Sequence, residues 1–148
     1  MNCLEDDWEN ELRWASMVLL KYLLPFLKDV FDREDYIEVY PEMIKRLDDA
    51  QDGIRIETCL VFEIFFDQLP DPWSGSLYDY CVKTIFIHLD DQNEQVQKAV
   101  LAVLKKASRV QQSDFIQIAR EMEGKSSATH LCKVLLDHAT GDILIADE

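Results

Sequence analysis

The chain has 148 residues, and its 29 acidic against 15 basic side chains give a formal net charge of −14 at pH 7. Nucleic acid and anionic membrane surfaces are therefore disfavoured as partners, because both are bound chiefly through Lys and Arg. The sequence contains few glycines, few prolines and few alternating strand patterns, which predicts an all-α protein. No apolar run approaches the roughly 18 residues that a transmembrane helix needs.

The first predicted helix covers residues 8–31, in which leucines recur at helical spacing. Pro25 is expected to kink or end this helix, since proline removes a hydrogen-bond donor and clashes one turn back. A second helix is predicted to start at residues 32–35, because acidic side chains stabilise the positive end of the helix dipole. Pro41 lies inside this helix, which predicts a kink or a restart there.

A turn over residues 48–53 separates the second helix from a partner helix over about 54–69. Residues 70–75 contain two prolines and a glycine and are predicted to be a linker. Ser76 and Asp79 match the pattern of a capping box, in which the serine accepts from the third backbone N–H. We therefore expect Ser76 to cap the following helix.

The next helix pair, over about 77–90 and 94–108, repeats the apolar pattern of the preceding pair at an offset of 42 residues. Two shorter helices are predicted at about 113–123 and 127–139. They depart from the repeat, as terminal capping units usually do. Residues 140–148 are expected to fray as a tail.

An aspartate pair recurs with this period, at 6–7, 48–49 and 90–91. A period of about 40–47 residues with two helices per unit is typical of HEAT and armadillo arrays. The sequence therefore predicts a single HEAT-type α-solenoid domain over residues 1–148. Its expected parts are the second helix of a truncated repeat (8–31), HEAT repeats at 32–69 and 76–108, capping helices at 113–139 and a tail at 140–148. Because residues 8–31 match only the second helix of a unit, we expect the C-terminal end of a longer solenoid.

Polar residues three positions after each aspartate pair, among them Asp52 and Glu94, are expected to precede a helix and to accept from its free N–H groups. Arg13 and Arg55 follow at equivalent positions. In a stacked array each arginine can reach the acid of the neighbouring repeat, which predicts a ladder between repeats. Exposed members of such a ladder contribute about 0–1 kcal/mol each.

The acidic turns have two interpretations. Asp48, Asp49, Asp90 and Asp91 could line one edge and dock a basic partner segment, whose association electrostatic steering would accelerate. Alternatively, these aspartates cap helices and keep the array soluble. We expect the capping role in either case, and we treat docking as the functional hypothesis.

Apolar side chains offer a second candidate surface. The helix over 54–69 carries a second apolar face, which consists of Ile56, Leu60 and Ile64. It could form a groove for a client helix, but the simpler interpretation is that an inner repeat packs on both of its neighbours. Tryptophans are frequent interface anchors; Trp14 is expected in the core, and Trp73, in the linker, is expected to be exposed.

The sequence predicts no catalytic, cofactor or metal site. His88, His130 and His138 are scattered and lack the spacing of a zinc site or of a nucleophile–base pair. A glycine-rich phosphate loop is missing from the sequence. The four cysteines show no paired spacing, which favours reduced thiols in the cytosol.

Several segments, taken in order and spacing, resemble the C-terminal HEAT repeats of the dynein axonemal assembly factor 5 family. They are residues 40–49, 52–55, 87–91, 100–105 and 127–136. The resemblance covers about residues 36–139, and the chain departs from the family pattern in the linker around Trp73 and after Thr140.

This resemblance implies a cytoplasmic, non-enzymatic scaffold that assists the preassembly of the dynein arms of cilia and flagella. Its implied partners are axonemal dynein chains, chaperones or other assembly factors, and it implies no cofactor. The alternative is a HEAT-repeat adaptor of another class, of the transport-receptor or phosphatase-scaffold type.

Overall fold

The computed structural model describes residues 3–70 and 75–146, with side chains for 8–70 and 75–141. Over these residues the chain forms seven α-helices and a short 3₁₀ helix, and no strand, which confirms the all-α prediction. The helices are α1 (Cys3–Leu27), α2 (Arg33–Leu47), α3 (Asp52–Gln68), α4 (Ser76–Ile87), η1 (His88–Asp90), α5 (Glu94–Val110), α6 (Gln112–Glu123) and α7 (Thr129–Ala146).

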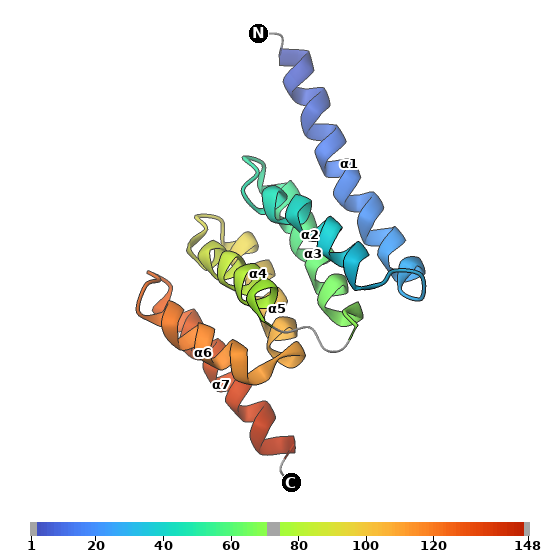
Figure 1. Ribbon diagram of the computed structural model, residues 1–148. Coiled ribbons are helices and arrows are strands. Elements are labelled where there is room, and N and C mark those ends of the chain that lie inside the picture. The colour runs from blue at the N-terminus through green and yellow to red at the C-terminus, as the bar shows by residue number, and fades with distance from the viewer. Residues whose placement is uncertain (1–2, 71–74, 147–148) are drawn as a thin grey trace.

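Successive helices pair as α2–α3, α4–α5 and α6–α7, and the pairs lie side by side in one row (Figure 1). Helix α1 lies at one end of the row and the α6–α7 pair at the other. Helices α1, α3, α5 and α7 contact one another in that order and form one layer, whereas α2, α4 and α6 form the second. Helix α3 therefore packs against both α1 and α5.

Aromatic side chains fill the space between the two layers. Tyr36 of α2 packs edge-on against Phe65 of α3, with ring centroids 5.6 Å apart. Tyr78 of α4 is fully buried, and its hydroxyl donates to the carbonyl of Ala107 in α5 at 2.7 Å. The α2–α3 and α4–α5 pairs are thus each joined by a buried tyrosine from the first helix, and the hydroxyl of Tyr78 finds a partner.

The helix starts agree with the sequence prediction in one case and differ in three. Asp52 is itself the first residue of α3, whose cap position falls on Gln51, so it does not precede the helix as expected. Asp32 caps α2 and forms a reciprocal capping box with Asp35. Ser76 does not cap α4, because the helix already begins at Ser76 and the cap position falls on Gly75. The φ of +90° at Gly75 is one that glycine adopts without strain. Asn93, one residue before Glu94, accepts from the first N–H groups of α5, so Glu94 is the first helical residue and not the cap.

Three further expectations differ from the structure. The aspartate pair at residues 6–7 lies inside α1 and not ahead of a helix start. Helix α2 runs through Pro41, so the chain does not restart there. Helix α7 continues to Ala146, into the segment expected to fray, and the hydroxyl of Thr140 donates to the carbonyl of Leu136 within it.

None of the helices within residues 3–70 and 75–146 is both long and apolar enough to cross a bilayer.

Candidate functional site at the helix turns

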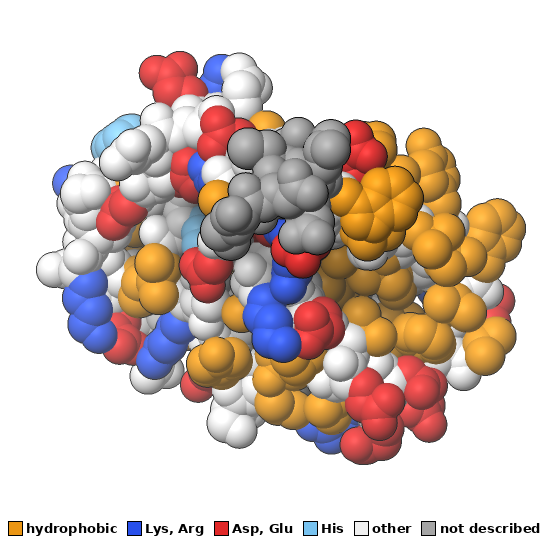
Figure 2. Space-filling view, turned by 90° about the horizontal axis from the view of Figure 1, so that it is seen from above, with side chains coloured by type: hydrophobic (Ala, Val, Ile, Leu, Met, Phe, Trp, Pro, Cys, Tyr) orange, Lys and Arg blue, Asp and Glu red, His pale blue; other side chains and the backbone are white. Residues whose placement is uncertain are grey.

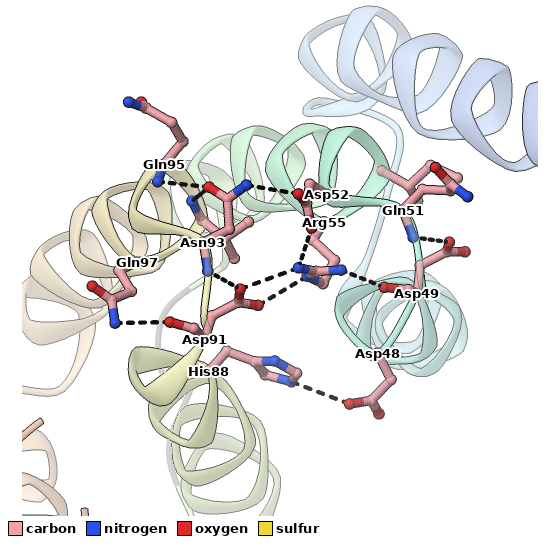
Figure 3. A network of polar contacts seen from close by, with 12 residues as sticks. Asp48, Asp49, Gln51, Asp52, Arg55, His88, Asp91, Asn93, Gln95 and Gln97 are labelled. Carbon is pink, nitrogen blue, oxygen red and sulfur yellow. Dashed lines mark hydrogen bonds and ion pairs between the residues drawn. The ribbon is translucent and has the colours of Figure 1, made fainter. Parts of the chain in front are cut away.

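The turn between α2 and α3 and the turn between α4 and α5 meet at one edge of the molecule (Figure 3). Polar side chains from both turns and from the start of α3 point toward one another there. We call this group the turn edge, and its members are Asp48, Asp49, Asp52, Arg55, His88, Asp91 and Asn93.

Arg55 is the centre of the turn edge. Its Nε and Nη2 donate to the two carboxylate oxygens of Asp91 at 2.9 and 3.1 Å. Its Nη1 donates to the carbonyl of Asp49 at 2.7 Å, and Nη2 also donates to Asp52 Oδ1 at 2.5 Å. One guanidinium therefore joins both turns to α3 through a two-pronged carboxylate contact, the geometry that arginine favours.

The same arrangement stands 42 residues earlier. Arg13 of α1 donates through Nε and Nη2 to the two carboxylate oxygens of Asp49, at 2.6 and 3.3 Å. It also donates to Asn10, as Arg55 does to Asp52. In both cases the arginine reaches an aspartate 36 residues further along the chain.

Gln97 stands 42 residues after Arg55 and keeps only part of this pattern. Its Nε2 donates to the carbonyl of Asp91 at 2.8 Å, as Arg55 Nη1 does to the carbonyl of Asp49. A neutral amide thus retains the contact with the preceding turn, but it brings no cation to the next carboxylate.

Backbone N–H groups complete the turns. Asp49 Oδ1 accepts from the N–H of Gln51 at 3.0 Å, and Asp91 Oδ1 accepts from the N–H of Asn93 at 2.9 Å. The side chain of Asn93 then donates to Asp52 Oδ2 at 2.7 Å, across to the neighbouring turn. Each inner aspartate therefore shapes its own turn while it binds an arginine from the helix that precedes its own helix pair, Arg13 of α1 or Arg55 of α3.

The inner aspartate of the first turn is held as a carboxylate. Only 4% of the Asp49 side chain is exposed. Burial alone would raise the pKa of Asp49, but the hydrogen bonds from Arg13 and from the Gln51 N–H outweigh it and hold this pKa below its ordinary value. Asp49 is therefore charged at neutral pH and fully occupied by its partners.

The outer aspartate of the same turn has a different environment. The Asp48 side chain is 74% exposed, and its Oδ1 lies 3.4 Å from Nε2 of His88. Burial lowers the pKa of His88 below its ordinary value and outweighs the opposing pull of Asp48. His88 is therefore neutral at pH 7, and the negative charge of Asp48 is not cancelled by it.

Asp90, the outer aspartate of the second turn, is exposed but engaged. Its Oδ1 accepts from the hydroxyls of Ser126 and Ser127 and from the N–H of Ala128, each at 2.9 Å. Burial would raise the pKa of Asp90, yet these donors hold it below its ordinary value. Asp90 thus fastens the α4–α5 turn to the start of α7.

The four aspartates proposed for docking therefore differ in their availability. Asp49 and Asp91 are directed inward and bind arginines, and Asp90 binds the turn before α7. Asp48 remains largely exposed, and half of the Asp52 side chain is exposed beside it. Asp48 is thus the carboxylate of the α2–α3 turn that is open to a partner, whereas both oxygens of Asp52 accept hydrogen bonds, from Arg55 and from Asn93.

The apolar candidates lie elsewhere. Ile56 and Ile64 are half-buried and pack against the core, and Leu60 is at the margin of exposure. Trp14 is 47% exposed, so the expectation that it lies in the core was wrong. Trp73 lies outside the described residues.

Sequence reasoning did not single out Asn93 or His88. Asn93 could have been found, since asparagine is a better helix cap than the glutamate that follows it. His88 has no local signal, because its environment comes from a turn that lies far away in the sequence. The exposed apolar face of α1 was also missed, since its leucine spacing only indicates a helix with an apolar side.

Cysteine thiols and possible metal ligands also occur among the described residues. Cys59, Cys81 and Cys132 are free and buried, and burial raises the pKa of Cys59 and Cys81 to about 12. Both thiols are therefore protonated at neutral pH and unreactive. Across the part of the chain that the structure describes, no group of three or more His, Cys, Asp or Glu residues could hold a metal ion.

Comparison with known proteins finds similarity to one group of curated proteins. The chain is 27% identical over 139 residues to dynein axonemal assembly factor 5 of Mus musculus and to that of Xenopus laevis, each covering 91% of this chain. It is 26% identical over 137 residues to dynein axonemal assembly factor 5 of Homo sapiens. The chain spans only 16% of the length of each of these relatives. No protein-family model matches the sequence, and no solved structure matches the chain.

Proposed function

We propose that the chain is a non-enzymatic, protein-binding scaffold of the HEAT-repeat class that acts in the assembly of axonemal dynein. The observation that carries the proposal is the similarity to dynein axonemal assembly factor 5, which extends over about nine-tenths of the chain. The row of helix pairs supports the scaffold part of the proposal, because such arrays present extended surfaces for other proteins.

The turn edge is the surface that we assign to partner binding. Arg55 and Arg13 hold the turns at fixed positions relative to the preceding helices. Asp48 therefore stands as a preorganised negative charge, and ordering it on binding requires little further loss of entropy. A basic segment of a partner fits this chemistry, and the net charge of −14 would steer it toward the chain.

The partners proposed by this similarity are axonemal dynein chains, chaperones or other assembly factors, met in the cytoplasm before dynein reaches the cilium. Neither a nucleic acid nor a membrane is part of the proposal.

The test is affinity capture from the cytosol of ciliating cells, with the 148-residue chain as bait and mass spectrometry as the readout. The test variant replaces the open carboxylate, Asp48→Lys. The matched control places the same charge change at an exposed acid away from the turn edge, Glu38→Lys. Both variants have the same net charge, so a difference between them reports position.

We expect dynein heavy or intermediate chains on the wild-type and control baits, and a loss of at least fivefold on the Asp48→Lys bait and at high salt. Recovery of a transport cargo or a phosphatase subunit in place of dynein would contradict the proposal and favour a HEAT adaptor of another class. Equal recovery of dynein on all three baits would keep the function but remove the turn edge from it.

A further inference from the structure

A small pocket of about 240 Å³ lies between α1 and α3, next to the α2–α3 turn. Trp14 and Glu11 line it from α1, and Gly53 and Ile54 line it from the start of α3. Most of the surface inside it is apolar. Pockets for small-molecule ligands hold roughly 300–1,000 Å³, so this one has the size for a single side chain of a partner.

Trp14 and Gly53 give the pocket its shape. The indole of Trp14 is 47% exposed. Outside its own turn of helix, no described heavy atom lies within 4 Å of the place that a Cβ on Gly53 would take. The glycine therefore leaves open a space that a longer side chain would fill, and the aromatic ring stands beside that space.

The partial exposure at Trp14 is a property of its position in the row. Ile56 stands 42 residues later, in α3, which packs against both α1 and α5. Ile56 is only half-buried although its helix has a neighbour on each side. Side chains at this position thus point outward between adjacent helices. The pocket is formed by α1 and α3 alone and does not depend on the other side of α1.

The charges near the pocket are mainly negative. Glu11 is exposed at the pocket, and among the described residues no side-chain hydrogen bond or ion pair engages it. Asp52, in the first turn of α3, offsets the partial positive charge of the helix start. Arg13, next to Trp14 in the sequence, is already bound to Asp49. Acidic side chains also lie among the apolar ones on the side of the molecule where α1 lies (Figure 2).

We propose that this pocket binds an arginine side chain of the partner's basic segment, with the guanidinium against the Trp14 ring and paired with Glu11. Tryptophan is the aromatic side chain that attracts cations best. The apolar stem of the arginine would lie along Ile54. Arginine fits better than lysine, because its flat guanidinium stacks on an aromatic ring.

The inference rests on the proposed function, since it specifies one contact of the basic segment that we assign to the turn edge. Gln51 lines the pocket and belongs to the same turn as Asp48. One extended segment can therefore place an arginine in the pocket and a second basic residue at Asp48.

The test uses two synthetic peptides, acetylated and amidated, of four Gly-Arg repeats or four Gly-Lys repeats. Both carry the same charge, so general attraction to an acidic chain is equal and a difference reports the guanidinium. The 148-residue chain is titrated with each peptide at the same salt concentration, and NMR follows the indole N–H signals. We expect the arginine peptide to bind at least threefold more tightly and to shift the Trp14 signal.

Two variants install the residues that the chain itself carries 42 positions later. Trp14→Ile copies Ile56 and keeps an apolar wall without the indole, whereas Gly53→Gln copies Gln95 and fills the pocket. Each should weaken the arginine peptide at least fivefold and abolish the preference for arginine. Trp8→Ile, at an exposed tryptophan of α1 outside the pocket, is the matched control and should change neither. Circular dichroism checks that all three variants remain folded.

Equal binding of the two peptides would overturn the inference, and so would a preference for arginine that Trp14→Ile or Gly53→Gln leaves intact. The capture experiment judges the proposed function separately. If the wild-type bait recovers dynein but the peptides bind equally, the function stands and the arginine pocket is wrong. If the preference depends on Trp14 but no dynein is recovered, the pocket is supported and the proposed function is contradicted.

Discussion

Helices α1 and α3 carry the same sequence pattern, but equivalent apolar side chains are exposed in α1 and buried in α3. Leu19 of α1 and Val61 of α3 stand 42 residues apart, yet Leu19 is exposed and Val61 is fully buried. The same contrast holds for Leu23 and Phe65. Both helices use an arginine at the equivalent place to bind the next turn. The two helices therefore share the arginine contact and differ in how their other apolar side chains are covered.

The difference comes from the neighbours of each helix. Helix α3 lies between α1 and α5 and has α2 as its pair, so its apolar faces are covered on several sides. Helix α1 lies at the end of the row, and within the described residues it packs mainly against α3. An apolar position in such an array thus becomes core or surface according to its place in the row, and the local pattern does not distinguish the two.

The sharpest way to test this contrast is to truncate the equivalent residues of the two helices. Phe65→Ala should lower the free energy of unfolding by about 3–5 kcal/mol, because a fully buried ring leaves a cavity. Leu23→Ala should change it by much less, since nearly half of this side chain already meets water. Urea unfolding at low protein concentration measures both. Equal losses for the two variants would show that the face of α1 is covered within the monomer.

A smaller effect is expected at the arginines. Arg55→Met should cost about 2–3 kcal/mol, because it removes the two guanidinium hydrogen bonds to Asp91 and the one to the carbonyl of Asp49 in a partly buried place. Arg13→Met should cost less, since Arg13 lies at the end of the row and its side chain is twice as exposed. Thermal unfolding of both variants shows which of them loses more stability. A larger loss of stability for Arg13→Met would contradict the view that the Arg55–Asp91 contact stabilises the fold more than the Arg13–Asp49 contact does.

The smallest expected effect is a pH dependence at Asp49. The folded-state pKa of Asp49 is lowered, so its carboxylate stabilises the fold above the unfolded pKa, near 3.9, and this stability is lost as pH falls through the folded pKa. In Asp49→Asn this contribution is absent. The difference in melting temperature between wild type and Asp49→Asn should therefore shrink as pH is lowered from 7 to 3. A difference that stays constant would mean that Asp49 is not stabilised as a carboxylate.

Helix positions could be predicted from the sequence because they depend on local signals. The apolar period, the acidic start at Asp32 and the proline-rich linker located the helices α2 to α6 to within a few residues, whereas α1 starts five residues earlier and α7 ends seven residues later than predicted. The equivalent placement of Arg13 and Arg55 could likewise be seen from their spacing. Such features lie within a few residues of one another, or recur with the same period.

Features that depend on tertiary surroundings could not be predicted. Asp48 and Asp49 are adjacent in sequence, yet one is open to solvent and the other is saturated by Arg13, because the direction of each side chain follows from the turn. Trp14 reads as a core residue, but it lies on a helix without a second neighbour. The burial that keeps His88 neutral is supplied by packing that its own sequence neighbours do not specify.

The comparison of α1 with α3 is tested most directly by hydrogen–deuterium exchange of the wild-type chain. If the two helices differ only in what covers them, amide exchange should be faster in α1 than in α3. An α1 that is as protected as α3 would contradict the account.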